Sequence, residues 1–414
     1  MAFDAEQFNR RREARQKRRQ QKIARAKKLR LIALIAGAVV LIAGILALIL
    51  SLKGCQDSKP AETTAPAPIN TTVIHLAAAG DLNVTQKVVG SGSNYTNTFM
   101  DVLAPLSEAN ITTLNFEGGL YGAPYGEDAS APEALPQALK KAGVDMVQLA
   151  NSYAIHRGTA GLSSTILGMQ SAGLTPLGVW HDPADAKKSG GYTMVEVEGV
   201  KICFVAFTKG MDGMALPLGS EGCVNLLYTD YATAYQEVDT EGINKVLKAA
   251  EKEKPDLTVA LLHWGSEFND TVSASQKEIV KVMQDGGVDA IIGTHSHYLQ
   301  SMSLDPATGK FVAYSLGDFL GDAERPGSNY SVILDLEITK NNDTGETKVT
   351  NFSYTPIYTV TEKDNPRLVQ IGTAIRAYEE GHIDRVSQET YEAMKYALER
   401  IEARIHSDKK EEAS

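Results

Sequence analysis

The sequence predicts a mixed α/β domain that follows a single membrane-spanning helix. From about residue 72, short runs rich in β-branched residues alternate with longer helix-like stretches, which is the pattern of an α/β core. Residues 192–198 and 201–207 flank Gly199 as two strand-like runs. This arrangement is typical of an antiparallel hairpin, so the sheets should be mixed. Residues 31–52 are uncharged and apolar except for one serine, and such a helix is long enough to cross a bilayer.

The expected strands are short and are bounded by turn residues. They cover residues 73–79, 111–115, 146–150, 194–197, 200–207, 257–263, 290–293, 311–315 and 331–339. The expected helices are longer, and several end at a glycine or before a proline. They cover residues 132–142, 161–172, 239–252 and 275–285, followed by a charged helix from about residue 389.

Composition excludes several classes of protein. A hydrophobic content of 43% and a charged content of 22% indicate a folded chain rather than a disordered or fibrous one. Three cysteines cannot form a disulfide scaffold. Residues 1–30 hold 12 Lys/Arg and 3 Asp/Glu, which leaves 29 of the 41 basic and 48 of the 51 acidic residues in the rest. That larger, acidic part would repel phosphates, so nucleic acid is not an expected partner.

The charge around the apolar stretch predicts its orientation. A basic arm precedes it and only Lys53 follows closely, so the N-terminus should stay in the cytoplasm and the rest should lie outside. A cleaved signal peptide is the alternative, but its apolar core would be ~7–15 residues. The predicted organisation is a basic cytoplasmic arm at 1–30, a transmembrane helix at 31–52, a Pro/Ala/Thr-rich linker at 53–71, a folded domain at 72–386 and a charged C-terminal helix or tail at 387–414.

Apolar runs in this chain repeatedly end in a side chain that can bind a metal ion. These side chains are Asp81, Glu117 with the nearby Asn115, Asn151, His263, and His295 with His297. Ligands of open α/β sheets bind outside the carboxyl ends of the strands, so these groups could meet in one crevice. Imidazole, carboxylate and amide groups fit one or two divalent ions. A pair of ions ~3.5–4 Å apart polarises substrate oxygens and activates water.

Six motifs in series resemble the CapA family of bacterial capsule and poly-γ-glutamate biosynthesis proteins. They are Gly80-Asp81, Asn115-Phe-Glu117, Asn151-Ser-Tyr-Ala154, His263-Trp-Gly265, Gly293-Thr-His-Ser-His297 and Tyr314-Ser-Leu-Gly-Asp-Phe319. The resemblance covers roughly residues 73–319. It implies a four-layer α/β/β/α sandwich, similar to the calcineurin-type metallophosphoesterases, with a metal site at the strand ends. It also implies an N-terminal anchor in a bacterial cell membrane.

The resemblance further implies roles for the candidate ligands. Asp81 would bind the first metal and Glu117 would bridge the two. Asn151 and His263 would bind the second metal, and His295 and His297 would complete the pair. The ions would be Mn, Zn or Fe, and the sequence does not say which.

Three positions depart from the family pattern. Tyr153 stands where the pattern has a histidine that is a candidate general acid or oxyanion stabiliser, and His156 stands where it has an aspartate. These two residues are the candidate catalytic groups. A tyrosine with an unperturbed pKa of ~10 is a poorer acid at pH 7 than a histidine. Asn83 occupies the position of the histidine in the Asp-x-His motif of phosphoesterases.

The resemblance implies a membrane-anchored, extracytoplasmic protein that acts on an anionic surface polymer such as poly-γ-glutamate, or helps to assemble and export it. The chemistry would be metal-dependent hydrolysis of an amide or ester. Two alternatives stay open. The chain could be a non-catalytic subunit that binds polymer or partner proteins within a membrane synthase complex, or it could be an extracytoplasmic phosphoesterase.

Overall fold

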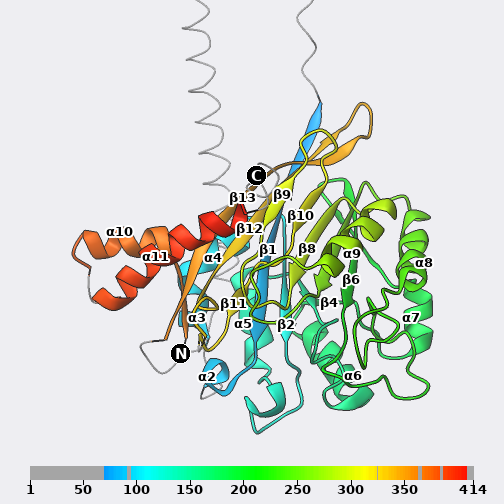
Figure 1. Cartoon of the computed structure of the whole chain (residues 1–414), viewed down its shortest axis with the longest axis horizontal. Helices are drawn as coiled ribbons and strands as arrows, with labels where there is room; N and C mark the ends of the chain where they lie inside the picture. Colours follow the sequence, from blue (N-terminus) through cyan, green and yellow to red (C-terminus); the bar gives the residue numbers. More distant parts are fainter. Residues whose placement is uncertain (1–69, 91–94, 324, 362–365, 383–385, 408–414) are drawn as a thin grey trace, which may run out of the picture. The chain divides into compact units, whose positions relative to one another are not determined.

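The computed structural model describes residues 70–407 except 91–94, 324, 362–365 and 383–385 (Figure 1). By its internal contacts the chain divides into Met1–Pro68 and Ile69–Ser414, and the fold below is that of the second unit. The predicted arm, transmembrane helix and nearly all of the linker lie outside the described residues. Within the described ranges, no helix combines the length and apolarity needed to cross a membrane.

The first of two sheets is built around a long central strand, β1. Its strand order is β14-β13-β12-β1-β2-β3-β4, and β11 also pairs with β1. The bounds are β1 (Thr71–Asn83), β2 (Ile111–Glu117), β3 (Met146–Gln148), β4 (Thr175–Leu177), β11 (Asp318–Leu320), β12 (Tyr330–Asn341), β13 (Thr347–Val360) and β14 (Arg367–Gln370). Strands β1 to β4 are parallel neighbours, whereas β12, β13 and β14 pair antiparallel. The sheet is therefore mixed, as the sequence predicts.

The second sheet has the order β5-β6-β7-β8-β10-β9. The bounds are β5 (Thr193–Val197), β6 (Val200–Thr208), β7 (Leu257–His263), β8 (Ala290–Thr294), β9 (Met302–Leu304) and β10 (Phe311–Ala313). Strands β6, β7, β8 and β10 are parallel neighbours. The expected hairpin around Gly199 is confirmed, because β5 and β6 pair antiparallel with Val197 opposite Val200.

The helices cover the outer faces of the two sheets, except for the last two, which pack with the core between the sheets. Their bounds are α2 (Gln86–Val89), α3 (Thr96–Phe99), α4 (Leu103–Ser107), α5 (Ala134–Ala142), α6 (Gly158–Ser171), α7 (Pro183–Ser189), α8 (Thr240–Glu251), α9 (Ala274–Asp285), α10 (Ile371–Glu379) and α11 (Gln388–Ile405). One apolar cluster contains residues of helices α2, α3, α4, α5 and α6, which pack on the outer face of the first sheet. Another joins α8 and α9 to the outer face of the second sheet.

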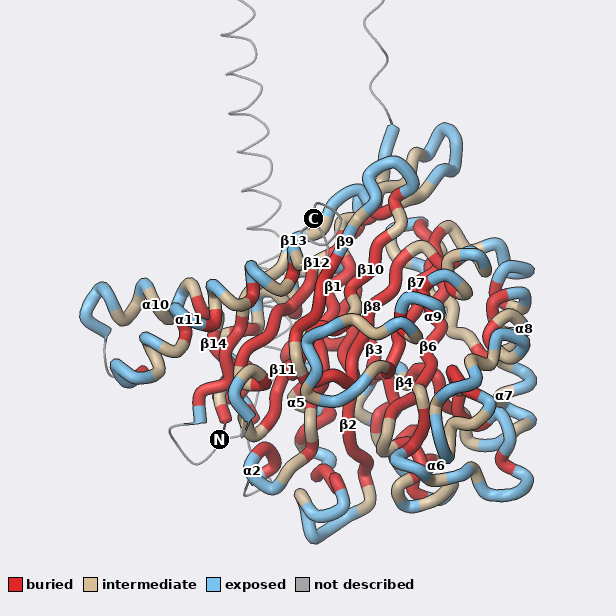
Figure 2. The backbone as a smooth tube through the Cα atoms, viewed as in Figure 1, coloured by how far each residue is buried: buried red, intermediate tan, exposed pale blue. Residues whose placement is uncertain are grey.

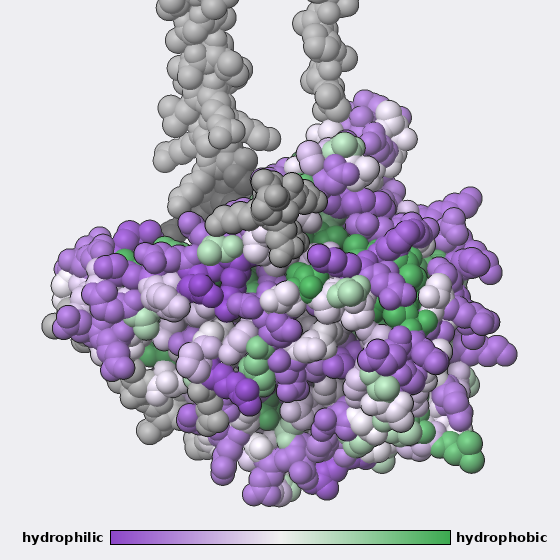
Figure 3. Space-filling view, in the orientation of Figure 1, coloured by the Kyte–Doolittle hydropathy of each residue, from purple (hydrophilic) through white to green (hydrophobic). Residues whose placement is uncertain are grey.

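A third apolar cluster lies between the sheets and defines the layering. It contains Leu76 of β1, Phe204 of β6 and Leu261 of β7 among its buried members. Because alternate residues of a strand point to opposite faces, each sheet can pack on its partner and on its own helices at once. The result is an α/β/β/α sandwich, and Figure 2 shows its strands buried along most of their length. The face in Figure 3 is largely hydrophilic, with hydrophobic residues in small patches.

Helix α11 belongs to this inner core. The charged helix expected from about residue 389 is present, and its Met394, Ala397, Ile401 and Ile405 are fully buried among the residues between the sheets. Their helical spacing forms one apolar stripe, while Glu392, Lys395, Glu399 and Glu402 are exposed. In Figure 1, α10 and α11 lie along β12 and β13.

Candidate metal centre

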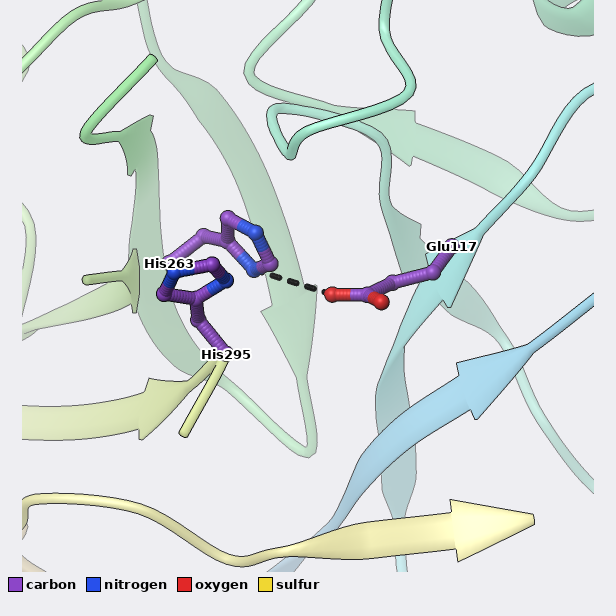
Figure 4. Close-up of side chains that lie close together, drawn as sticks. All are labelled: Glu117, His263 and His295. Carbon is purple, nitrogen blue, oxygen red and sulfur yellow. Dashed lines mark ion pairs between the residues drawn. The ribbon is translucent and has the colours of Figure 1, made fainter. Parts of the chain in front are cut away.

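Six buried side chains from the two sheets form two groups, and each group could hold a metal ion. The ligand atoms within a group lie within 4.8 Å of one another. The first group, here called the aspartate cluster, contains Asp81, His297 and Asp318. The second group, here called the glutamate cluster, contains Glu117, His263 and His295. Figure 4 shows Glu117 reaching from β2 toward the two imidazoles, with its carboxylate 3.4 Å from Nδ1 of His263.

The end of β1 brings the two aspartates of the first cluster side by side. A Cβ atom on Gly80 would lie 1.8 Å from the carbonyl oxygen of Gly317, so only glycine permits this approach. The amide of Asp81 donates to that same oxygen at 3.0 Å. As a result, Asp81 and Asp318 are register partners across the parallel pair β1 and β11.

The His-Ser-His segment after β8 is held in an unusual backbone conformation. His295 has φ of 88° and His297 has φ of 57°, in the left-handed region that costs a non-glycine residue about 1–3 kcal/mol. Oδ2 of Asp81 accepts a hydrogen bond from the amide of His295 at 2.9 Å. Positive φ at both positions turns the two imidazoles into the site, one into each cluster.

Asn115 connects the two clusters. Its Nδ2 donates to Oδ1 of Asp81 at 2.6 Å and lies 3.3 Å from Oε1 of Glu117 and from Nδ1 of His263. Its Oδ1 accepts from Nδ2 of Asn151 at 3.0 Å. One amide therefore contacts a carboxylate of each cluster, which places the two candidate ion sites next to each other.

The environment of the three carboxyl groups disfavours their ionised form. Burial raises the pKa of Asp81 to about 6, with Asp318 adding to the rise and His297 opposing it. Burial, followed by the charge of Asp81, raises the pKa of Glu117 well above its usual range. Burial also raises the pKa of Asp318. Desolvation and mutual repulsion both disfavour three ionised carboxylates in this space.

The histidines divide into two kinds. Burial lowers the pKa of His263 and of His295 well below the usual value, and the neighbouring positive charges of His297 and Lys209 add to this. Both side chains are therefore neutral imidazoles at pH 7, the form that binds metals. Burial would also lower the pKa of His297, but its ion pair with Asp318 at 2.7 Å, with Glu117 and Asp81 nearby, raises that pKa to about 11.

The donor set fits divalent cations. Three carboxylates and three imidazoles are buried together, and the single proton of His297 balances only part of the negative charge. Two divalent ions would offset both the burial and the mutual repulsion that raise the pKa values of these carboxyl groups. Mixed nitrogen and oxygen ligation of this kind suits Zn²⁺, Mn²⁺ or Fe²⁺, so the chemistry of the site favours divalent metal binding without identifying the ion.

The remaining residues predicted from the sequence lie around these clusters. Asn151 uses Nδ2 to donate to the carbonyl of Phe116 at 2.7 Å, and its Oδ1 accepts from the amide of Tyr153 at 3.0 Å. Tyr153 is half-buried, and burial followed by the charge of Glu117 raises its pKa. His156 lies with Nε2 4.0 Å from Asp128. The ligand role of Asn151 and the catalytic roles of Tyr153 and His156 stay predictions.

One member of the site, and the connecting role of another, were not predicted. Asp318 follows Gly317 just as Asp81 follows Gly80, and that repeated pair was the available signal. Asn115 was noted at its strand end without a role. Asn83, at the position of an expected histidine, hydrogen-bonds to Asp318, and this bond counteracts the raised pKa of that carboxyl.

The fold and the two clusters define a class of protein, namely a two-sheet α/β/β/α domain with a candidate metal centre at the carboxyl ends of its strands. The chain belongs to the family described as "Bacterial capsule synthesis protein PGA_cap", whose sequence model matches residues 75–323. The family predicted from the sequence motifs is therefore confirmed.

Curated relatives agree with this assignment. The chain is 29% identical over 213 residues to "Capsule biosynthesis protein CapA" of Bacillus anthracis, covering 51% of this chain and 48% of that protein. It is 27% identical over 213 residues to "PGA biosynthesis protein CapA" of Bacillus subtilis (strain 168), covering 51% of each. The matched part thus spans about half the length of these relatives. Among solved structures, the calcineurin-like phosphoesterase YfkN from Bacillus subtilis is similar with a TM-score of 0.45 and 14% identity, over 80% of this chain and 100% of that one.

Proposed function

We propose that this chain is a membrane-anchored, extracytoplasmic protein that makes, trims or helps to export an anionic surface polymer such as poly-γ-glutamate. Its folded unit would hydrolyse an amide or ester bond in a metal-dependent reaction. The observation that carries the proposal is the pair of buried ligand clusters joined by Asn115. The family membership and the names of the curated relatives supply the polymer.

Each cluster would bind one metal ion. Asp81, His297 and Asp318 would hold one ion, and Glu117, His263 and His295 would hold the other. When bound, two such ions polarise a carbonyl oxygen and make water a competent nucleophile near neutral pH. Asn115 would keep the clusters at a fixed spacing because its amide contacts both of them.

Tyr153 would act as a hydrogen-bond donor rather than as a proton source. Burial and the nearby charge of Glu117 raise its pKa above the usual phenol value, so the hydroxyl keeps its proton at neutral pH. A neutral phenol can orient a substrate oxygen, but it donates its proton poorly. Replacing it with histidine, as in Tyr153→His, should raise the rate of amide hydrolysis and introduce a pH dependence near 6–7.

The experiment is to purify the full chain in detergent and to compare it with the His295→Ala/His297→Ala variant. Metal content would be measured by mass spectrometry, and activity by the cleavage of a γ-linked glutamate oligomer in the presence of Mn²⁺ or Zn²⁺. We expect metal uptake and cleavage to be lost together. Cleavage that survives in a variant without metal would contradict the proposal.

The specific departures at Tyr153 and Asn83 favour a second candidate, a non-catalytic subunit that binds polymer or partner proteins in a membrane synthase. It predicts that the metal-loaded chain binds the oligomer but leaves it intact. Any metal-dependent turnover by the purified chain rejects it. An extracytoplasmic phosphoesterase would instead hydrolyse a chromogenic phosphodiester.

A further inference from the structure

A pocket opens beside the glutamate cluster. Its volume is about 270 Å³, and its walls come from the loops that follow β3 of the first sheet and β6, β7 and β8 of the second. The lining residues are Ser152, Lys209, Gly210, Asp212, Tyr235, Ser266, Glu267 and His295. The hydroxyl of Ser152 lies 3.1 Å from Nε2 of His263, and His295 is itself a cluster member. A molecule in this pocket would therefore touch the candidate metal centre.

Lys209 is fixed in the wall of this pocket. It directly follows β6, and its amide donates to the carbonyl of His263 at 2.7 Å. Its Nζ donates to the carbonyl of Gly265 at 2.9 Å and lies 4.6 Å from the ring centroid of Tyr235. An ammonium group has three donors, so two remain for a ligand after the bond to Gly265. The side chain is half-buried, which strengthens its interaction with an anion.

The charges of the lining residues are ordered from the inside outward. Lys209 is the only Lys or Arg among the described residues that line the pocket, and it lies next to the candidate metal centre. Asp212 and Glu267 are exposed and lie toward solvent. A carboxylate would be attracted inward to Lys209, while a positive group would be attracted to the two acids.

We propose that this pocket binds a zwitterionic α-amino acid terminus, with its carboxylate on Lys209 and its ammonium group facing Asp212 and Glu267. The pocket volume corresponds to roughly nine water molecules at ~30 Å³ each, which is room for one terminal amino-acid unit. The centre would then act at the end of a γ-linked glutamate chain rather than within it. This inference rests on the proposed function, because it assigns the substrate class of the same centre.

The test is calorimetric titration of the full, Mn²⁺-loaded chain in detergent with γ-glutamylglutamate. The matched probes are the N-acetylated dipeptide and the dipeptide amidated at the α-carboxylate of its amino-terminal residue. The protein variants are Lys209→Met and the charge-preserving Lys209→Arg. Lys187→Met, on the exposed side of α7, makes the same charge change away from the pocket.

We expect Lys209→Met to weaken dipeptide binding by about 10-fold or more, the effect of losing one charge-assisted hydrogen bond. Lys209→Arg should stay within about threefold of the unchanged protein, and Lys187→Met should bind normally. Both modified dipeptides should bind about 10-fold more weakly to the unchanged protein. Glu267→Gln together with Asp212→Asn should remove the penalty for N-acetylation.

Equal binding by Lys209→Met and the unchanged protein overturns the inference, as does equal binding of the dipeptide and its N-acetylated form by the unchanged protein. Metal content separates this failure from failure of the proposed function. If Lys209→Met retains its metal and its thermal unfolding midpoint but binds the dipeptide normally, only the pocket assignment fails. If the unchanged protein takes up no metal, the proposed function fails first.

Discussion

The aspartate cluster and the glutamate cluster have the same number of ligands, but their histidines differ in protonation state. In the aspartate cluster, His297 is protonated and forms an ion pair with Asp318. In the glutamate cluster, His263 and His295 are neutral. The proton on His297 supplies part of the positive charge that a cation would otherwise supply. The glutamate cluster has no such substitute, and its carboxyl group has a strongly raised pKa instead.

This difference means that a metal ion must displace a proton from a different group in each cluster. A metal entering the aspartate cluster must displace the proton of His297, so its affinity should rise with pH across the neutral range. In the glutamate cluster the imidazoles are already in the binding form, and the proton to be displaced belongs to Glu117. The two sites should therefore differ in affinity and in the protons they release.

Removing a single ligand from either cluster should have the largest effect on the metal content. We expect His263→Ala and Asp318→Asn each to lower the metal content from about two ions per chain to about one, because the two ligand groups are separate. Loss of a direct ligand should exceed the ~10–100-fold loss of affinity typical of outer-shell partners. Mass spectrometry of the dialysed protein measures the content.

His75→Ala is the matched control, because His75 pairs with Asp335 at 3.0 Å outside both clusters. It should keep both ions. A complete loss of metal in either single-cluster variant would show that the two groups form one inseparable site.

Metal should stabilise the fold, and chelation should reverse the effect. An ion that binds only the folded state adds about 2.7 kcal/mol to the free energy of unfolding at a concentration 100 times its Kd. Two sites should add about twice that value, and Asp318→Asn should show roughly half of the gain. Urea unfolding with Mn²⁺ or with EDTA measures this, and an unchanged midpoint would argue against both sites.

In the metal-free protein, Glu117→Gln should be stabilising by about 1–3 kcal/mol, the cost of burying an uncompensated polar or charged group. The folded pKa of Glu117 lies above its unfolded value of 4.5, so its contribution to stability is complete below pH 4.5. That contribution is lost as pH rises toward the folded pKa. The advantage of the variant should therefore grow from pH 5 to pH 8.

Urea unfolding in EDTA at several pH values checks this, with Glu196→Gln, at the exposed position of β5, as the control. A variant that is less stable than the unchanged protein at pH 8 would contradict this prediction.

The smallest expected effect concerns the support of His297. Phe268 stacks on its ring with centroids 4.9 Å apart, and the guanidinium carbon of Arg325 lies 3.9 Å from the ring centroid of Phe268. Phe268→Leu should weaken metal binding at the aspartate cluster by about 10-fold and leave the glutamate cluster unchanged. Titration calorimetry that shows two sites resolves the difference, and an equal loss at both sites would contradict this role.

Local patterns were sufficient to predict much of the fold. The strand expected at 257–263 coincides with β7, and most other expected strands and helices lie within a few residues of observed ones. Strand β13 was not predicted, and its Pro356 is a poor strand signal. Pro356 lies just outside the pairing with β14, which begins at Ile357. There the missing amide costs no hydrogen bond to that neighbour.

The site was harder to predict where it depends on pairing between distant segments. Asp81 and Glu117 each follow an apolar run in the sequence, so each was visible by itself. Asp318 begins the three-residue strand β11 and reaches the site only because that strand pairs with β1. Lys209 resembles any charged residue after a strand, and only the packing of Tyr235 and Gly265 around it reveals a pocket.

The most direct test is X-ray diffraction from Mn²⁺-soaked crystals of the chain, with data collected at the manganese absorption edge. We expect two anomalous peaks ~3.5–4 Å apart, one bound by Asp81, His297 and Asp318 and the other by Glu117, His263 and His295. Crystals without any peak among these six side chains, under conditions in which Mn²⁺ binds elsewhere on the protein, would contradict the central claim.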